Sequence, residues 1–240
     1  MKKRLKRLLR SSPPAISRVN TLQETVDTIY SQQYRRTLEI LDSLAHDNAG
    51  TVAKALAHSV HAACAEAQMA ATRLYPEVPV QLNCRASCAW CCYEQLQVHI
   101  LDAVGVAASL SAPLDYQLET RNGNELKKIF RPCPFLGADT RCTVYKHRPL
   151  VCRAYHSIDV TECQRVVESQ EAARQVPMNI RYYGFPGLVQ EATLKVFEEL
   201  TIDRRPVVLG LAVATLSRDF DRITAHWLAG GDAFEETTVS

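Results

Sequence analysis

The feature that most constrains this chain is a cluster of cysteines near its middle. Of nine cysteines among 240 residues, four lie in the nine-residue stretch from Cys84 to Cys92. Closely spaced thiols let one loop turn several sulfurs toward a common centre, as in zinc and iron–sulfur sites. Four more cysteines follow after a gap of 40 residues. The cysteines expected to bind metal are Cys84, Cys88, Cys91, Cys92, Cys133, Cys142, Cys152 and Cys163.

The expected compartment bears on the state of these thiols. The first 20 residues, MKKRLKRLLR followed by SSPPAISRVN, contain no apolar run of the kind that an export signal needs, so we expect a cytoplasmic protein. Thiols stay reduced there, and an odd number of cysteines suits a complete set of disulfides poorly. The clustered cysteines are therefore interpreted as metal ligands. Cys64, which stands apart in an alanine-rich segment, is interpreted as a small core residue.

Two neighbouring cysteines limit how the ligands can be shared. Adjacent side chains tend to diverge, so Cys91 and Cys92 are not expected to bind the same single ion. Eight cysteines then allow either two four-thiolate sites or one cluster with accessory thiols. The later cysteines lie among prolines that argue against self-sufficient packing, and metal ligation would supply folding energy there. We expect at least two of the later four to lie close to sulfurs of the first loop and to complete its metal shell.

Outside the cysteines the dominant pattern is helical. Apolar residues recur at three- and four-residue steps, with Thr21 or Asn20 as a cap for the first helix. No alternation typical of strands extends beyond a few residues. The predicted fold class is therefore mainly α, with helical segments around a cysteine-rich irregular centre. The expected elements are a helical hairpin at 19–75, helices at 93–110, 159–175 and 188–200, a turn at 182–187, a last helix at 206–228, and an irregular stretch with a small hairpin at 130–152.

Charge separates a basic arm from the rest of the chain. Residues 1–10 carry six Lys or Arg and no acid, which leaves 22 bases against 26 acids, or −4, elsewhere. A mildly acidic body indicates no specific nucleic-acid binding. No run of 18 apolar residues occurs, so no transmembrane segment is expected. We expect the arm to be a solvated, disordered tail; a weak contact with a membrane or an anionic partner is the alternative.

These patterns predict the domain organisation. A basic arm and linker at 1–18 precedes a single mainly helical domain at 19–240, which contains a cysteine module at about 84–166.

The strings around the cysteines resemble a known family. Cys-x3-Cys-x2-Cys-Cys at 84–92, Cys-Pro-Phe-Leu at 133–136, CTVYKHRPLVCR at 142–153 and Cys163-Gln-Arg are similar to the YkgJ-type cysteine-cluster family. The resemblance covers about residues 84–166 and implies a domain that chelates zinc or iron. One branch of the family resembles flagellin lysine N-methylases with an iron–sulfur cluster. Only that alternative implies S-adenosylmethionine as a cofactor.

The spacing of the first loop bears on the identity of the metal. Zinc sites commonly use Cys-x2-Cys, and only Cys88 and Cys91 have this spacing. The string Cys84-x3-Cys88-x2-Cys91, with Trp90 before the third cysteine, also resembles the cubane-binding motif of radical S-adenosylmethionine enzymes, although the βα repeats of their barrel are missing. The spacing therefore favours a [4Fe-4S] cluster over Zn²⁺, and both stay open.

Two arginines are candidates for binding the cofactor. Arg148 and Arg153 flank Cys152, and a guanidinium beside thiolates can donate hydrogen bonds and offset their negative charge. A surface salt bridge is the alternative for each.

Three functions stay open from the sequence. The first is a metal-binding protein whose centre is structural, a carrier or an electron-transfer site. The second is an iron–sulfur and S-adenosylmethionine-dependent protein lysine N-methyltransferase. The third is a zinc-stapled interaction module whose helical flanks bind a protein partner. No dinucleotide, phosphate-loop or Gly-x-Ser-x-Gly string occurs, so whether the chain is an enzyme is also open.

Overall fold

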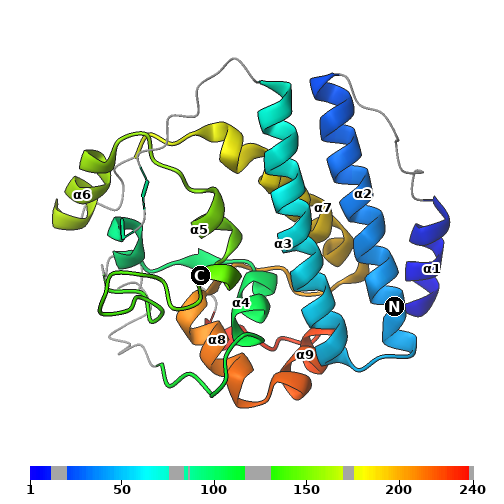
Figure 1. Cartoon of the computed structure of the whole chain (residues 1–240). Coiled ribbons are helices and arrows are strands. Elements are labelled where there is room, and N and C mark those ends of the chain that lie inside the picture. Colours follow the sequence, from blue (N-terminus) through cyan, green and yellow to red (C-terminus); the bar gives the residue numbers. More distant parts are fainter. Residues whose placement is uncertain (12–20, 76–83, 86, 117–130, 170–175, 238–240) are drawn as a thin grey trace. The chain divides into compact units, whose positions relative to one another are not determined.

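The fold is mainly α, as predicted. The computed structural model in Figure 1 describes residues 1–11, 21–75, 84–85, 87–116, 131–169 and 176–237. Within these ranges the regular structure is helical apart from one pair of two-residue strands and two isolated bridges.

The chain divides into two compact units. The helical unit comprises Met1–Pro79, Arg181–Arg204 and Asp219–Ala233; the cysteine unit comprises Val80–Ile180, Arg205–Arg218 and Phe234–Ser240. The chain passes between the two units several times. The single domain expected over 19–240 stays a prediction.

The predicted hairpin at 19–75 is confirmed in the helical unit. Helices α2 (Leu22–Asp42) and α3 (Ala49–Leu74) pack against each other and are connected through the 3₁₀ turn η1 (Ser43–Ala45), as Figure 1 shows. Thr21 is the N-cap of α2: its hydroxyl accepts a hydrogen bond from the Glu24 N–H, and the Glu24 carboxylate accepts one from the Thr21 N–H. This reciprocal box satisfies two donors that a helix start leaves without partners.

Two further helices complete the core of the helical unit. They are α7 (Ile180–Leu200), of which all but Ile180 belong to this unit, and α9 (Phe220–Leu228). Phe197 of α7 and Trp227 of α9 meet edge to face with ring centroids 5.5 Å apart, and both are buried. The Trp227 indole N–H donates to the Asp203 carbonyl at 2.8 Å, so the ring is buried with its polar atom satisfied.

The prediction of a turn at 182–187 is wrong, because α7 runs straight through Pro186. Proline has no N–H, so it leaves the carbonyl four residues earlier without its helical partner. That carbonyl belongs to Tyr182, and the Gln68 side chain of α3 donates to it at 3.4 Å. One turn away on α3, the buried Cys64 thiol lies 3.8 Å from the Pro186 carbonyl, which confirms Cys64 as a core residue. Packing against α3 therefore stabilises a helix that its own sequence disfavours.

The prediction of a disordered basic tail is wrong for residues 2–11. They form α1 (Lys2–Ser11), which packs against α2. Leu5 is buried, Leu8 and Leu9 are half-buried, and the Lys and Arg side chains of the helix are exposed. The leucines recur at helical spacing, so a helix can bury them together while its charges stay in water. Residues 12–18 of the expected linker lie outside the described residues.

In the part of the chain that the structure describes, no helix combines the length and the apolar character needed to cross a bilayer.

Short elements make up the cysteine unit. Its core is formed by α4 (Ile100–Ala107) packed against α8 (Leu209–Arg218), beside the antiparallel strands β1 (Gln97–Val98) and β2 (Val207–Val208). Gln97 pairs with Val208, and Val98 with Val207. The remaining elements are η2 (Trp90–Tyr93), η4 (Tyr145–His147), α5 (Leu150–Ala154), α6 (Val160–Ser169) and η5 (Glu235–Thr237).

Two helix predictions need correction here. The predicted helix at 93–110 is confined to α4, because the residues before it form η2 and β1. The predicted helix at 206–228 begins instead with β2 and then breaks into α8 and α9, since the Asp219 side chain accepts from the Arg222 N–H and caps a new helix. The helix at 159–175 is confirmed as α6 up to Ser169, and 170–175 lie outside the described residues.

Candidate metal centre

The first cysteine loop is a tight turn followed by η2. The Cys88 N–H donates to the Arg85 carbonyl at 3.0 Å, and Ser87 between them has a left-handed φ of 68°. The Cys92 N–H donates to the Ala89 carbonyl at 2.9 Å as η2 begins. These bonds bend the backbone twice within nine residues, and the loop is short enough for its four thiols to lie near one another.

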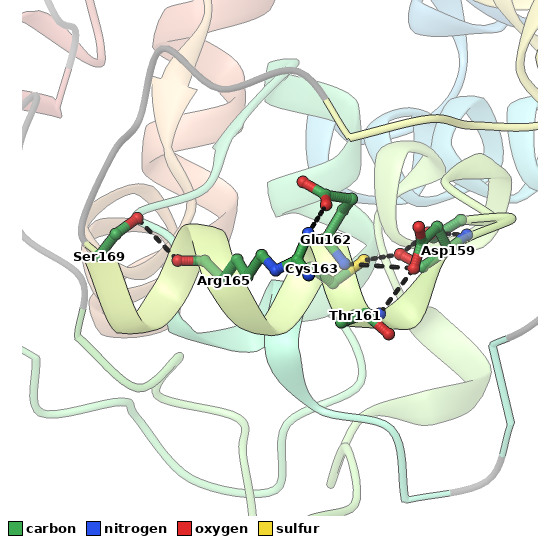
Figure 2. Close-up of polar contacts among 7 residues, drawn as sticks. Asp159, Thr161, Glu162, Cys163, Arg165 and Ser169 are labelled. Atoms are coloured by element: carbon green, nitrogen blue, oxygen red, sulfur yellow. Dashed lines mark hydrogen bonds and ion pairs between the residues drawn. The ribbon is translucent and has the colours of Figure 1, made fainter.

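Cys163 of α6 is connected to Cys84 of the first loop through two polar residues. The Ser157 N–H donates to the Cys84 sulfur at 3.3 Å, and the Ser157 hydroxyl donates to the Asp159 carbonyl at 2.8 Å. The same carbonyl lies 3.6 Å from the Cys163 sulfur, a contact drawn in Figure 2. The Asp159 carboxylate also accepts the Thr161 N–H at 2.9 Å at the start of α6. Ser157 and Asp159 therefore position a late cysteine beside an early one, and α6 as a whole packs against η2.

Backbone contacts connect Cys133 to the first loop and Cys142 to the turn that follows Cys133. The Cys133 N–H donates to the Cys92 carbonyl at 2.6 Å. The Leu136 N–H donates a hydrogen bond to the Cys133 carbonyl at 2.9 Å and closes a turn. Leu136 also pairs with Cys142 in an isolated antiparallel bridge. The small hairpin predicted within 130–152 is thereby confirmed.

Cys152 lies on α5, whose first turn is held by a buried carboxylate. The Asp102 Oδ1 atom accepts the Leu150 N–H at 2.7 Å, and Asp102 is 4 % exposed. This bond ties the helix that carries Cys152 to α4 of the unit's core.

The pKa values of the thiols show which cysteines are electrostatic neighbours. Burial raises the pKa of Cys84, the Ser157 N–H lowers it, and the Cys88 and Cys91 thiolates raise it further. Burial also raises the pKa of Cys163, where Ser157 opposes the shift and the thiolates of Cys84, Cys88 and Cys91 add to it. Cys84, Cys88, Cys91 and Cys163 are called the first group below; Cys91 also neighbours Cys92, because the hydrogen bond to Cys92 is the main cause that raises the pKa of Cys91.

The other four cysteines form a second set of neighbours. A hydrogen bond from the Cys91 thiol lowers the pKa of Cys92, whereas burial and the thiolates of Cys133, Cys152 and Cys142 raise it. Burial raises the pKa of Cys133, and the Cys142 thiolate is among the charges that raise it further. Burial is the largest cause that raises the pKa of Cys152, and the negative charges of Cys91, Cys133 and Asp102 raise it further. Cys92, Cys133, Cys142 and Cys152 are called the second group below.

The two candidate arginines have different surroundings. The positive charge of Arg148 lowers the pKa of Cys152, and its guanidinium carbon lies 3.8 Å from the Tyr145 ring centroid. Its Nε atom is buried and has no hydrogen-bond partner among the residues that the structure describes. Arg153 donates from Nε to the Arg148 carbonyl at 2.8 Å and from its guanidinium to the Lys146 carbonyl. Arg148 is therefore the charge beside a thiol, and Arg153 supports the turn that carries it.

The donor chemistry of this unit fits a thiophilic metal. None of the nine cysteines, all of which the structure describes, forms a disulfide. Most of these cysteines are half-buried, and thiols with raised pKa values keep their protons until a cation displaces them, so metal binding would release protons. Among the described residues, however, no three His, Cys, Asp or Glu side chains are arranged to hold an ion directly. Ligation would therefore require the thiols to rotate inward, and their role as ligands stays a prediction.

A pocket lies beside Cys133. Its lining includes Gln95, Tyr116 and Arg131 as well as Cys133. Within the described part of the chain, both polar atoms of the Gln95 amide are buried and have no hydrogen-bond partner. The Tyr116 ring lies against Gly210 so closely that a Cβ atom at this position would clash with it. The pocket has a volume of about 20 Å³ and therefore holds about one water molecule.

Reasoning from the sequence missed Ser157, Asp159 and Asp102. Asp159 precedes a helical run, and this cap pattern was available as a signal. Ser157 and Asp102 carried no comparable signal, because each acts on a backbone or sulfur atom that is distant in sequence, at Cys84 and at Leu150.

Comparison with known proteins agrees with the resemblance seen in the sequence. Residues 83–175 match the family model CxxCxxCC, described as "Putative zinc- or iron-chelating domain". No curated protein and no solved structure was found to match the chain. The matched range contains both groups of cysteines, together with Ser157, Asp159, Arg148 and Arg153. Residues 83–175 are thus similar to a domain whose family model is described as a "Putative zinc- or iron-chelating domain".

Proposed function

We propose that the first group binds an iron–sulfur cluster, with Cys84, Cys88 and Cys91 as the closely spaced ligands and Cys163 as the fourth. The observation that carries the proposal is the connection from Cys84 through Ser157 and Asp159 to Cys163. The x3 and x2 spacing of the loop is the pattern used for cubane clusters. A fourth thiolate from α6 completes the ligand number that such a cluster needs.

The surroundings of the first group suit sulfur ligands. The Ser157 N–H donates to the Cys84 sulfur, and such hydrogen bonds stabilise a thiolate and tune the reduction potential of a cluster. Ser157 is fully buried, so this donor is held in place by the fold and is shielded from water.

Four protein thiolates would leave no open position on the cluster. A closed cluster supports electron transfer or a structural role, whereas catalysis at a metal needs a free coordination position. The proposed function is therefore an electron-transfer or structural iron–sulfur site, and S-adenosylmethionine has no role in it.

Zinc in the first group is the second candidate. Cys88 and Cys91 have the Cys-x2-Cys spacing of zinc sites, and four thiolates match a closed tetrahedral shell. With zinc the domain would be a structural staple.

Methyl transfer is the third candidate and rests on the family resemblance, because the pocket beside Cys133 has a volume of about 20 Å³ and holds about one water molecule. Binding of S-adenosylmethionine to the metal-loaded chain, measured by calorimetry, would support this candidate; the leading proposal expects none.

The test of the leading proposal is the composition of the full chain purified without oxygen. We expect iron and acid-labile sulfide in equal amounts and the visible charge-transfer absorption of thiolate-bound iron. Cys84→Ser and Cys163→Ser should each diminish that absorption, while Cys64→Ser, a buried cysteine of the helical unit, should leave it unchanged. A colourless wild-type protein with zinc lost in the same two variants would replace the cluster by the zinc staple.

A further inference from the structure

We propose that α1 (Lys2–Ser11) is a docking surface for the anionic phospholipid headgroups of a bilayer. It holds the helical unit against the bilayer surface by charge alone, without insertion into the hydrocarbon. The proposal is independent of the metal, because the helical unit contains none of the eight clustered cysteines.

The two sides of α1 differ in composition. Its three leucines lie within about 100° of one another around the helix axis, and Leu5 is buried where α1 packs against α2 (Figure 1). The basic side chains are all exposed and cover the opposite arc of roughly 200°. They are Lys2, Lys3, Arg4, Lys6, Arg7 and Arg10. The apolar side is therefore already used within the chain, and α1 offers charge to a partner.

The basic charges of α1 do not stabilise the helix itself. Residues four positions apart are neighbours on a helix, so Lys2 with Lys6 and Lys3 with Arg7 bring like charges together. The first turn contains no acid, although the helix dipole already places positive charge there. Among the described residues, no carboxylate forms an ion pair with any of the six basic side chains. A helix that only covered α2 would need its leucines and not this charge, which points to an anionic partner outside the chain.

The acidic surroundings of α1 favour a flat partner over one that encloses the helix. Helix α2 has four exposed acids against two arginines, and these acids are Glu24, Asp27, Glu39 and Asp42. Packed helices lie about 8–10 Å apart, which is about one Debye length at physiological salt. A bilayer surface meets only the outer side of α1 and stays at least this far from α2. A duplex groove that admits a helix would bring phosphates on both sides toward the acids of α2.

The side chains of α1 also suit lipid headgroups better than bases. The helix has no aromatic residue that could stack on a base and no Asn or Gln that could read one. Its only other polar side chain is Ser11, whose hydroxyl donates to the carbonyls of Arg7 and Leu8. Clusters of about four to eight Lys or Arg on an amphipathic helix are typical of anionic-lipid binding, and the six of α1 fall in this range.

The first test is co-sedimentation of the full, metal-loaded chain with vesicles. One set contains phosphatidylcholine alone, and the other contains equimolar phosphatidylcholine and phosphatidylserine. We expect binding to the phosphatidylserine vesicles only, and loss of binding in molar salt, where the Debye length falls to about 3 Å. Binding to both sets, binding to neither, or binding that survives molar salt would overturn the proposal.

Charge variants test whether α1 is the surface that binds. Lys3→Gln/Arg7→Gln removes two charges from exposed positions and keeps the leucines and a good helix former at each position. Each Lys or Arg near an anionic surface strengthens binding about five-fold, so this variant should bind phosphatidylserine vesicles roughly 30-fold more weakly. Lys3→Arg/Arg7→Lys keeps the charge and should bind as wild type does.

A matched control separates α1 from the net charge of the chain. Arg73→Gln/Arg218→Gln removes two charges from exposed positions on α3 and α8 and should bind as wild type does. If this variant loses as much binding as Lys3→Gln/Arg7→Gln, the attraction comes from the whole chain and the proposal is wrong. The metal content of every variant should equal that of wild type, so the outcome does not depend on which metal the cysteines hold.

A random-sequence DNA duplex tests the other polyanion at the same salt and phosphate concentration. We expect the chain to bind the duplex more weakly than the phosphatidylserine vesicles. If the duplex binds more tightly and Lys3→Gln/Arg7→Gln loses that binding, α1 is a nucleic-acid contact and the lipid proposal is wrong.

Discussion

The two units of this chain hold themselves together in different ways. The helical unit contains α2 with 21 residues and α3 with 26, whose buried faces carry Leu38, Leu56 and other apolar side chains. In the cysteine unit α4, α6 and α8 have ten residues or fewer, and isolated helices shorter than about 12–15 residues are marginal in water. Helices α4 and α8 pack on each other, but the segments that carry the cysteines have few apolar residues to bury.

This difference shows where metal would matter. In the helical unit burial of apolar area is available as the main stabilising contribution. In the cysteine segments, residues far apart in the sequence are connected by individual hydrogen bonds, such as Ser157 to Cys84 and Cys133 to Cys92. The thiols in these segments are the groups that could bind a metal. Metal ligation would stabilise these segments, because its binding free energy adds to the folding free energy that apolar packing does not provide there.

Removal of metal should have the largest effect and should be confined to one unit. Structural zinc contributes on the order of 10 kcal/mol of folding free energy in small domains. We expect a chelator to expose the amides of 84–93 and 131–169 to hydrogen exchange in the full chain, while α2 and α3 keep their protection. Equal loss of protection in both units, or none in either, would contradict the comparison.

Truncation of a core side chain in the helical unit should lower the stability of that unit and leave metal binding by the cysteine unit unchanged. Leu38 is 0 % exposed, so Leu38→Ala should cost about 2–5 kcal/mol of unfolding free energy and leave the metal content unchanged. Denaturant unfolding followed by circular dichroism measures the loss. Leu22→Ala, at a position that is 49 % exposed in the same helix, is the matched control and should change the unfolding free energy little.

The role of Gln68 can be isolated by a double-mutant cycle. Gln68→Leu removes the donor to the Tyr182 carbonyl and should cost about 1 kcal/mol. Pro186→Ala restores the N–H that this carbonyl lacks, so Gln68→Leu should cost measurably less in that background. If the two costs simply add, Gln68 does not compensate for Pro186.

The smallest expected effect is a dependence of stability on alkaline pH. Burial and the hydrogen bond to Glu199 at 2.8 Å raise the pKa of Tyr34 above its usual value of 10.0. The folded state thus favours the protonated phenol, and this contribution is fully present below pH 10.0 and lost as the pH rises through the folded-state pKa. The unfolding free energy of Tyr34→Phe should fall less steeply above pH 10 than that of wild type. Tyr183→Phe, at an exposed tyrosine, should follow wild type.

The sequence predicted best where local patterns and packing agree. Thr21 and the apolar periodicity after it are sufficient to place α2, and Cys64 on the alanine-rich face of α3 is buried as expected. Two errors arose where a distant side chain reverses a local preference. Pro186 lies inside a helix because Gln68 of α3 bonds to Tyr182, and Leu5 orders the basic arm as α1 on α2.

The sequence predicted which cysteines belong to the candidate site, but not which of them lie next to one another. Spacing and the family resemblance identified the eight cysteines, since both are properties of the sequence. Which cysteines are neighbours depends on backbone bonds between residues far apart, such as Cys133 to Cys92, and on the buried Ser157. Such bonds leave no periodicity in the sequence, so these contacts could be found only in the structure.

X-ray absorption at the iron and zinc edges of the full chain, purified without oxygen, tests most directly whether cysteines hold the metal. We predict that iron has an all-sulfur shell with iron–iron scattering; if zinc occupies the first group instead, it should have four sulfur neighbours at about 2.3 Å. Shells of nitrogen and oxygen at both edges, or a protein that contains neither metal, would contradict metal binding by these thiols.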